Sequence, residues 1–119
     1  MFKFHEIEKK VIAELTDENF VISDVQDAVD LMGNVSFSGY SRIIIREKNL
    51  AADFYRLHTG LAGEILQKFS NYRIKLAIIG DFSEYKSKSL QDFIRESNKG
   101  NSIFFVENID EAFVRLTVK

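Results

Sequence analysis

Three acidic side chains follow apolar runs of the kind that form buried strands. Glu47 ends the first run, Asp81 comes after Gly80 at the end of the second, and Glu107 follows the third. In α/β folds the carboxyl ends of parallel strands meet at one edge of the sheet, where ligands bind. Carboxylates brought together there can exchange protons with a substrate. Acidic residues after strands also serve as turn and capping groups, and we favour this role because no nucleophile or metal ligand accompanies them.

Histidine offers a second kind of chemistry, at His5 and His58. His58 precedes a predicted helix, where an imidazole can act as an acid or a base or contact an anion. The favoured interpretation is an ordinary surface residue, and we expect His5 to lie on the surface of a strand. The two histidines form no HxH or HxxxH spacing, and cysteine is absent. We therefore predict no metal site, no cofactor and no thiol chemistry.

A run of lysine and serine before a predicted helix is a third candidate. It extends from Lys86 to Ser89, and a helix N-terminus that begins there can hold a phosphate group. A solvated turn explains the same residues and is favoured. No glycine pattern typical of a nucleotide-binding loop is present. Our ligand-binding candidates are Glu47, Gly80, Asp81, Ser87 and Lys88.

A protein-contact surface is the fourth candidate, and it precedes the central helix. Asp53 and Arg56 flank Phe54 and Tyr55, and aromatic residues and arginine are enriched in protein interfaces. Packing of both rings under the loop is the alternative, which we favour because the eleven phenylalanines indicate ordinary core packing. The candidates for interaction or switching are Asp53, Phe54, Tyr55, His58, Thr59 and Gly60.

The strands that must position these residues follow from hydrophobic periodicity. Apolar residues predict strands at 2–7 and 10–15, joined as an antiparallel hairpin whose turn lacks glycine and asparagine. Three further strands, at 42–47, 74–79 and 103–106, have apolar residues on both faces. Such strands are typical of a sheet interior that helices cover on both sides.

The first helix is indicated by its start and its stop. Ser23 and Gln26 form a capping-box pattern, and Gly33 closes the apolar period. In the loop that follows, we expect Phe37 and Tyr40 to anchor the chain against the core.

The central helix uses Thr59 as its predicted N-cap. Its glycines, Gly60 and Gly63, are expected to let the helix approach the sheet closely. The last helix begins with Asn108 and Glu111 as a capping pair. The apolar stripe of the central helix consists of Ala62, Ile65, Leu66 and Phe69.

The order of these elements predicts the fold class. A hairpin is followed by a helix and then by three strand–helix pairs, and such units imply parallel pairing with right-handed crossovers. We predict an α/β fold with a mixed, mostly parallel sheet of about five strands, an N-terminal antiparallel hairpin and about four helices. A length of 119 residues is too short for two independent cores, so one domain over residues 1–119 is expected.

Composition narrows the classes of partner. A net charge of −2 supplies no attraction to phosphate backbones, so we expect no nucleic-acid partner. No apolar run approaches the ~20 residues of a membrane helix, so no membrane contact is expected. The first residues are charged and lack the apolar core of a signal peptide. We therefore expect a cytoplasmic protein.

Five short segments carry a resemblance to a known family. They are Glu47-Lys48-Asn49, Thr59-Gly60-Leu61-Ala62-Gly63-Glu64-Ile65-Leu66-Gln67-Lys68-Phe69, Gly80-Asp81-Phe82, Ser87-Lys88-Ser89-Leu90 and Glu96-Ser97-Asn98. Over most of its length the chain resembles a small bacterial family known as domain of unknown function 4180. That family brings no established activity with it.

A more distant resemblance involves the segment Leu57-His58-Thr59-Gly60-Leu61. The element order is similar to that of STAS domains, found in bacterial anti-sigma factor antagonists and on anion transporters. There a strand ends in Asp-Ser-(Ser or Thr)-Gly-Leu, which opens a helix and contains a serine that a partner kinase phosphorylates. Thr59, Gly60 and Leu61 match, whereas Leu57 replaces the aspartate and His58 the serine. The resemblance implies a STAS-like fold, with Thr59 as the remaining phosphorylation candidate and helix capping as its favoured role.

Two functions follow from these patterns. The leading prediction is a non-catalytic, STAS-like interaction or regulatory module that contacts a protein partner through residues 49–60 and the adjoining helix, and a homodimer is left open. The alternative is a small-ligand or phosphate-binding domain, with or without weak enzymatic activity, built at the strand ends around Asp81 and His58. A deep pocket at that edge favours the second, and a flat edge favours the first.

Overall fold

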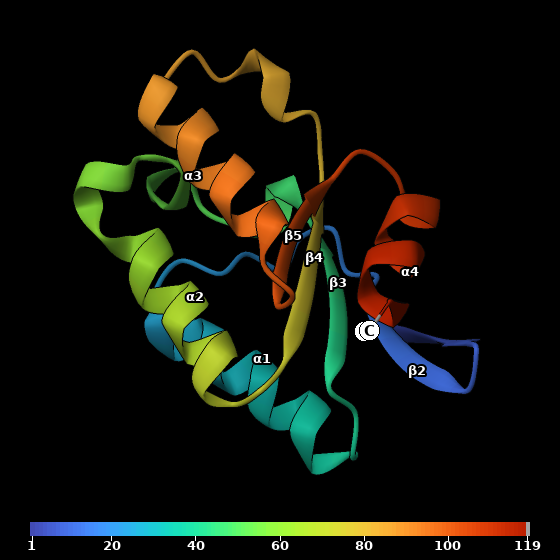
Figure 1. The fold of residues 1–119 in the computed structure, drawn as a ribbon. Helices are drawn as coiled ribbons and strands as arrows, with labels where there is room; N and C mark the ends of the chain where they lie inside the picture. The colour runs from blue at the N-terminus through green and yellow to red at the C-terminus, as the bar shows by residue number, and fades with distance from the viewer. Residues whose placement is uncertain (119) are drawn as a thin grey trace.

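Within residues 1–118, which the computed structural model describes, five strands form one sheet in the same order as along the chain. β1 (Phe2–Ile7) pairs antiparallel with β2 (Lys10–Leu15). β3 (Arg42–Arg46), β4 (Lys75–Ile79) and β5 (Ile103–Val106) then add in parallel (Figure 1). The predicted mixed, mostly parallel sheet with an N-terminal hairpin is confirmed.

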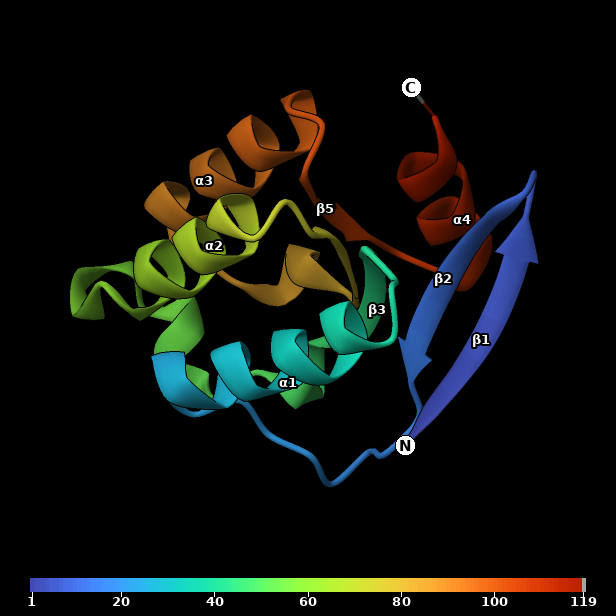
Figure 2. The ribbon, with the colours of Figure 1, turned by 90° about the horizontal axis from the view of Figure 1, so that it is seen from below.

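Four α-helices of this described range cover the two faces of the sheet. α1 (Val25–Phe37), α2 (Leu61–Asn71) and α3 (Lys88–Lys99) lie on one face, and α4 (Ile109–Thr117) lies on the other (Figure 2). Right-handed crossovers between neighbouring strands place successive helices on the same face. Since α4 follows the last strand, no crossover constrains it. None of the helices in residues 1–118 combines the length and apolar character needed to cross a bilayer.

The three isoleucines of β3 show why its sequence lacks alternation. Ile43 and Ile45 belong to the larger apolar core under α1, α2 and α3, whereas Ile44 belongs to the smaller core under α4. Successive side chains of a strand point to opposite faces, so both sets are apolar when helices cover both faces. The predicted interior strands at β3 and β4 are confirmed.

The start of α1 differs from the prediction by one residue. The side chain of Asp24, not that of Ser23, caps the helix by accepting the Asp27 N–H at 2.8 Å. Asp27 in turn accepts the Ser23 N–H at 2.9 Å. The reciprocal capping arrangement therefore exists, but it uses two aspartates in place of Ser23 and Gln26.

The end of α1 also differs. The helix continues through Gly33 to Phe37, because a glycine weakens a helix by only about 1 kcal/mol and does not by itself stop it. Phe37 is 94% exposed, so the prediction that it anchors a loop to the core is wrong. Tyr40 packs against the core as expected.

β5 is an outer strand, so the prediction of a third interior strand is wrong. Its residues are nevertheless buried, because α3 packs on one face of the strand and α4 on the other. A strand covered on both faces is apolar whether or not a further strand pairs with it. The sequence pattern therefore could not distinguish an outer strand from an interior one.

The two glycines at the start of α2 do not serve close packing of the helix against the sheet. Gly60 is the N-cap and has a φ of 80°, which glycine adopts at little cost. Thr59 is therefore not the N-cap, although its hydroxyl accepts the Leu61 N–H at 3.2 Å. A Cβ on Gly63 would meet open space, so the predicted close approach to the sheet is wrong.

Candidate functional site

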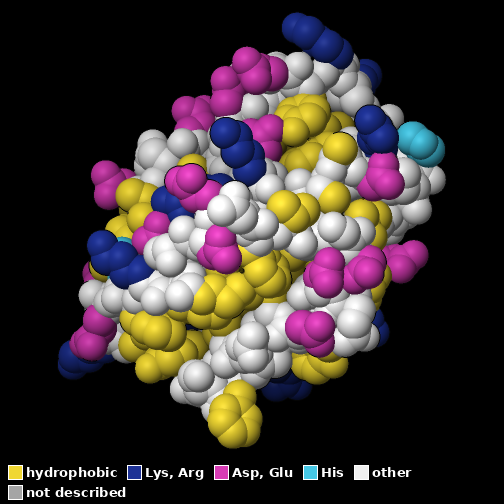
Figure 3. All heavy atoms as spheres, turned by 180° about the vertical axis from the view of Figure 1, so that it is seen from behind, with side chains coloured by type: hydrophobic (Ala, Val, Ile, Leu, Met, Phe, Trp, Pro, Cys, Tyr) yellow, Lys and Arg dark blue, Asp and Glu magenta, His cyan; other side chains and the backbone are white. Residues whose placement is uncertain are grey.

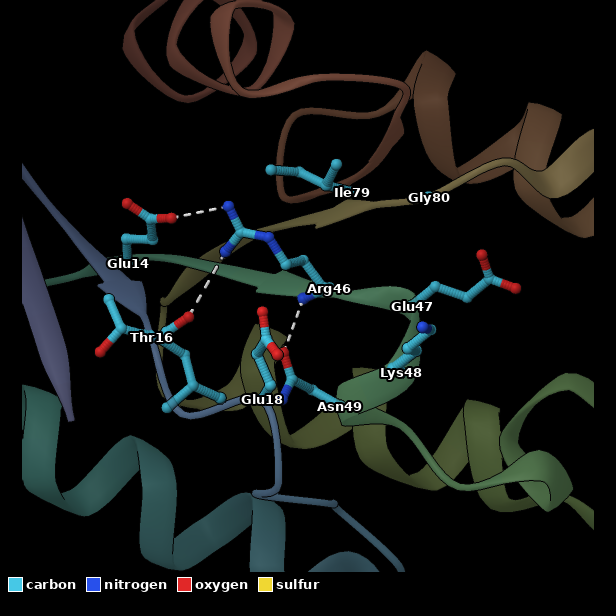
Figure 4. A pocket seen from close by; sticks show the side chains of 10 residues that line it. Glu14, Thr16, Glu18, Arg46, Glu47, Lys48, Asn49, Ile79 and Gly80 are labelled. Carbon is cyan, nitrogen blue, oxygen red and sulfur yellow. Dashed lines mark hydrogen bonds and ion pairs between the residues drawn. The ribbon is translucent and has the colours of Figure 1, made fainter.

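A pocket of about 520 Å³ lies where β2, β3 and β4 end. Its side chains come from the last residues of these strands and from the segments that follow them (Figure 4). This is the carboxyl edge at which α/β sheets bind ligands. We refer to it as the edge pocket, which is lined by Glu14, Leu15, Thr16, Glu18, Arg46, Glu47, Lys48, Asn49, Ile79 and Gly80.

Arg46 enters the edge pocket while held by Glu14. Its Nη2 lies 2.7 Å from Oε2 of Glu14 (Figure 4), and Oε1 of Glu14 lies 2.8 Å from Nε2 of His5. Burial raises the pKa of Glu14, but hydrogen bonds and charges from His5 and Arg46 outweigh burial and hold the pKa below its usual value. The glutamate is therefore a charged anchor that fixes the orientation of the guanidinium.

Strand periodicity brings this ion pair together. Ile12 and Ile44 point into the small core under α4, and Glu14 and Arg46 follow two residues later on the same face. Glu14 pairs with Ile44 across the two strands, so the Arg46 side chain reaches diagonally to the carboxylate. The sheet face is thus apolar beneath the helix and charged at its carboxyl end.

Arg46 retains hydrogen-bonding capacity for a ligand. Apart from the ion pair, its guanidinium donates one long hydrogen bond of 3.5 Å to the Leu15 carbonyl, which leaves most of its N–H donors unused. The side chain is 39% exposed. Within residues 1–118, Glu18, Glu47 and Lys48 form no ion pair. The pocket therefore presents unpaired groups of both signs.

Glu47 is held from the other side by two tyrosines. The Tyr85 hydroxyl donates to Oε2 of Glu47 at 2.5 Å, and the Tyr55 hydroxyl donates to its carbonyl at 2.9 Å. Burial, together with the nearby Glu47 carboxylate, raises the pKa of both tyrosines, which keeps them protonated donors. A Cβ on Gly80 would lie 2.7 Å from Glu47, so this wall of the pocket requires glycine.

Asn49 fixes the floor of the pocket from a buried position. Its Oδ1 accepts the Arg46 N–H at 2.9 Å. Its Nδ2 donates to the carbonyls of Asp17 at 3.2 Å and Phe20 at 2.8 Å. One amide therefore ties the end of β3 to the segment that follows β2, and the role of Asn49 is to support the site.

The three carboxylates predicted at the strand ends do not converge. Glu47 lines the edge pocket, whereas Asp81 and Glu107 line a second hollow of about 750 Å³, and only Gly80 belongs to both. Oδ1 of Asp81 accepts hydrogen bonds from the Ser83 hydroxyl at 2.6 Å and N–H at 3.2 Å, which lower the pKa of Asp81. Asp81 therefore caps the turn η4 (Phe82–Glu84), in agreement with the favoured interpretation.

The predicted phosphate-binding turn contributes to neither hollow. Ser87 is the N-cap of α3 and accepts the Leu90 N–H at 3.2 Å. Lys88 pairs with Asp92 on the same helix at 3.1 Å. Both residues therefore have ordinary roles at the start of a helix: Ser87 caps it, and Lys88 forms an ion pair within it.

The aromatic residues of the proposed contact loop are buried. Phe54 is 0% exposed and Tyr55 is 7% exposed, so the two rings form no exposed aromatic patch, and the favoured interpretation that they pack under the loop is confirmed. The rings lie in the turn η2 (Ala52–Tyr55) against the larger core. Burial is favourable because the rings are apolar. The Tyr55 hydroxyl still has a hydrogen-bond partner in the Glu47 carbonyl.

The polar residues of the same loop remain at the surface. Asp53 pairs with Arg56 at 3.1 Å. His58 is exposed in the turn η3 (Leu57–Thr59) and does not line the edge pocket. The Thr59 hydroxyl oxygen lies 2.9 Å from the carbonyl oxygens of both Asp53 and Arg56, and its single hydrogen is shared between them. This hydroxyl holds the loop closed in front of α2.

Residues 1–118 contain no group of three histidine, cysteine, aspartate or glutamate side chains that could hold a metal ion. Sequence reasoning did not place Glu14, Arg46 and Asn49 at this candidate site, and it gave His5 no partner. The available signal was a charge within or beside an apolar strand, since a charge in such a position needs a partner. Periodicity alone does not reveal that this partner lies on another strand.

The comparison with known proteins identifies the family of this protein but no activity. No curated protein and no solved structure matches the chain. The resemblance to STAS domains therefore stays a prediction. The profile of one protein family matches residues 7–116, which is nearly the whole chain. This protein belongs to that family, the domain of unknown function DUF4180.

Proposed function

We propose that this protein is a regulatory module that binds a small polar metabolite in the edge pocket and has no catalysis of its own. The observation that supports this is the Arg46 guanidinium, which Glu14 holds beside a pocket of about 520 Å³. Small-molecule sites have volumes of about 300–1,000 Å³. A donor that is already oriented loses less entropy when a ligand binds.

The lining indicates the class of ligand. Arg46 and Lys48 suit a carboxylate, and Glu18 and Glu47 suit an amino or hydroxyl group that donates to them. Acidic side chains outnumber basic ones in the lining, which disfavours a strongly anionic phosphate group. An amino acid or a small hydroxycarboxylate combines the required groups.

Within residues 1–118, the edge pocket holds no nucleophile with a base in hydrogen-bonding reach, and this supports binding over catalysis. His5 is engaged with Glu14, and its ring packs 4.9 Å from that of Phe113, outside the pocket lining. The Thr16 hydroxyl donates to the Met1 carbonyl at 2.9 Å. A nucleophile would need a base within hydrogen-bonding reach.

The experiment is a ligand titration of a matched pair of variants, Lys48→Glu and Lys86→Glu. Both lysines are exposed, but only Lys48 lines the edge pocket. The probes are free amino acids, hydroxycarboxylates, dicarboxylates and inorganic phosphate, and binding is followed by NMR shifts of the backbone amides. We expect an amino acid or hydroxycarboxylate to shift the amides of 14–18 and 46–49. Lys48→Glu should weaken binding about tenfold, whereas Lys86→Glu should match the wild type.

Two results would contradict the proposal. One is that no probe shifts the pocket amides at millimolar concentration. The other is that both lysine variants weaken binding equally, because the ligand would then respond to net charge and not to the pocket.

A second candidate function is contact with a protein partner through the loop 49–60. The observation that favours it is continuity, since the loop begins at the wall of the edge pocket and Tyr55 in the loop donates to the Glu47 carbonyl at 2.9 Å. A change at Glu47 on ligand binding would reach the exposed side chains of Asp53 and His58. This is the regulatory role that the resemblance to STAS domains implies.

The contact surface is tested with the double variant Asp53→Lys and His58→Glu, against Lys86→Glu as the control. All three positions are exposed, so the fold should be unaffected. A partner captured by the wild type and the control but lost by the double variant supports the loop. Equal capture by all three proteins excludes it.

A further inference from the structure

β1 has one unpaired side within residues 1–118. The Thr16 N–H donates to the Met1 carbonyl at 2.8 Å, and hydrogen-bonded pairs in an antiparallel hairpin alternate from such a pair. Every second residue from Met1 therefore bonds to β2. The N–H and C=O groups of Phe2, Phe4 and Glu6 consequently point away from the sheet.

Apart from the exposed charges of Lys3 and Glu6, this strand lacks the features that usually block an open edge. Its pairing with β2 is continuous from Phe2 to Ile7, so no bulge twists it away. The chain contains no proline. Natural edge strands are commonly short, bulged, covered or interrupted by proline, because an open edge accepts a further strand. β1 is therefore competent to pair.

Apolar side chains lie beside this open edge. Phe4 is 51% exposed and Met1 is 52% exposed, and the Phe4 ring lies 4.9 Å from that of the half-buried Tyr40. Hydrophobic side chains form a stripe on the side of the molecule that carries α1 and the hairpin (Figure 3). Large side chains bury about 150–250 Å² each, and about half of Phe4 and of Met1 is exposed, so the two offer on the order of 200 Å² of apolar surface.

We propose that β1 pairs antiparallel with β1 of a second copy of this chain, so that one sheet runs through a two-fold dimer. Outward-facing residues can pair only with outward-facing residues. The register centred on Phe4 uses all of them, with Phe4 opposite its own copy and Phe2 opposite Glu6. It places Lys3 opposite His5. The neighbouring registers would set Lys3 against Lys3 or His5 against His5, which is unfavourable.

The size of this contact determines its strength. A standard interface buries about 800 Å² on each partner, and the apolar patch supplies less than half of that area. Backbone hydrogen bonds along the strand add to the binding free energy. We therefore expect a reversible dimer that depends on protein concentration. The dimer does not rest on the edge pocket, so failure of either proposal leaves the other intact.

Cysteine cross-linking tests the register directly, because the chain contains no cysteine. Opposite residues of a hydrogen-bonded pair have Cα atoms about 5.5 Å apart, within the range of about 4.4–6.8 Å that a disulfide spans. Phe4→Cys should therefore form a disulfide dimer under mild oxidation. Phe2→Cys, which lies off the two-fold axis, should not. Tyr72→Cys is the exposure-matched control, since Tyr72 is 53% exposed and lies after α2.

Sedimentation velocity over a range of protein concentrations tests the dimer itself. The wild type and Tyr72→Lys should shift from monomer to dimer, whereas Phe4→Lys should bind its copy at least about tenfold more weakly. Glu6→Pro provides a second variant, because the Glu6 N–H points outward and proline removes it without breaking a bond to β2. Circular dichroism verifies that both variants fold.

Three outcomes would overturn the proposal. The wild type remains a monomer at every concentration. Phe4→Lys and Glu6→Pro dimerise as well as the wild type. Finally, an extended peptide of a different sequence binds at β1 in NMR experiments while copies of the chain do not pair with one another.

Discussion

The two outer strands end the sheet in different ways. The edge of β5 is closed by Asn98 of α3, whose Oδ1 accepts the Phe105 N–H at 2.7 Å and whose Nδ2 donates to the Phe105 carbonyl at 3.2 Å. Arg115 of α4 donates to the Asn98 carbonyl and holds it in place. On β1, no side chain within residues 1–118 hydrogen-bonds to the outward-facing backbone groups.

This difference shows how little is needed to close a sheet edge. The side-chain amide of Asn98 presents a donor and an acceptor with the spacing of a peptide group, so it occupies the place where a further strand would pair. A single residue therefore occupies the pairing position at Phe105 of β5. The absence of an equivalent residue on β1 is what leaves that edge free for another chain.

The largest effect is expected from opening the closed edge with Asn98→Leu. The Phe105 backbone groups would lose both partners in a buried position, and each unsatisfied group costs about 1–3 kcal/mol. The free energy of unfolding should fall by about 2–4 kcal/mol in urea denaturation, and the protein should aggregate. Asn34→Leu on the exposed side of α1 is the control. Equal losses from both variants would show that the Asn98 side chain does not close the edge.

A smaller effect is expected from Glu14→Gln, which weakens the link between β1 and the rest of the sheet. Glu14 holds β1 through His5 at 2.8 Å and β3 through Arg46 at 2.7 Å. The neutral amide should lower the free energy of unfolding at pH 7 by about 1–2 kcal/mol. Urea denaturation measures this loss, and Glu8→Gln in the exposed hairpin turn should show none.

The effect of Glu14 should also depend on pH in a defined direction. Its pKa is lower in the folded protein than the ordinary value of 4.5, so its stabilisation is complete above that value. Stability is then lost as the pH falls through the folded-state pKa. The gap between wild type and Glu14→Gln should therefore shrink below pH 4.5. A gap that stays constant down to strongly acidic pH would contradict the assignment.

Removing the charge that supports the closed edge should have a modest effect. The Arg115 guanidinium lies 4.5 Å from the centre of the Phe104 ring and donates to the Asn98 carbonyl. Arg115→Met keeps the aliphatic stem. In thermal denaturation it should lower the free energy of unfolding by about 1 kcal/mol. Arg95→Met on the exposed surface of α3 should cost less. If Arg95→Met costs as much, Arg115 contributes nothing specific to β5.

The smallest effect is expected at the hairpin turn, and it is a gain. Glu8 and Lys9 have φ values of 52° and 68°, which side chains adopt reluctantly. Lys9→Gly should therefore raise the free energy of unfolding by about 0.5–1 kcal/mol, while Lys10→Gly within β2 should lower it. Thermal denaturation measures both changes. A lower melting temperature for Lys9→Gly would mean that the turn is not strained.

The sequence predicted the layers of the fold because buried strands and helices have recognisable patterns of apolar residues. The unbroken isoleucines of β3 indicated helices on both faces, and Asn108 indicated the start of α4, where its side chain accepts the Glu111 N–H at 2.9 Å. It could not predict that β5 lies at the edge, because α3 and α4 cover both faces of β5 and give it the apolar pattern of an interior strand.

The candidate site was less predictable, because its contacts join distant parts of the chain. Glu14 and Arg46 lie on different strands, and only the sheet register shows that they meet. Likewise, nothing in the local pattern around Phe54 and Tyr55 decides whether the rings point inward. The strand ends indicated the edge of the sheet at which the pocket lies. They did not indicate that the guanidinium of Arg46 lines that pocket.

The order of the strands also has a consequence for how the protein forms. Because each strand pairs with the one synthesised just before it, the sheet can grow by addition at one edge while translation continues. Residues paired in the parallel ladders lie about 30 residues apart, as Ala13 and Ile43 do, so these pairings should form more slowly than the hairpin. α4 comes last and covers the apolar side chains of Ile44 and Ala77. Its formation seals the second core only after the sheet is complete.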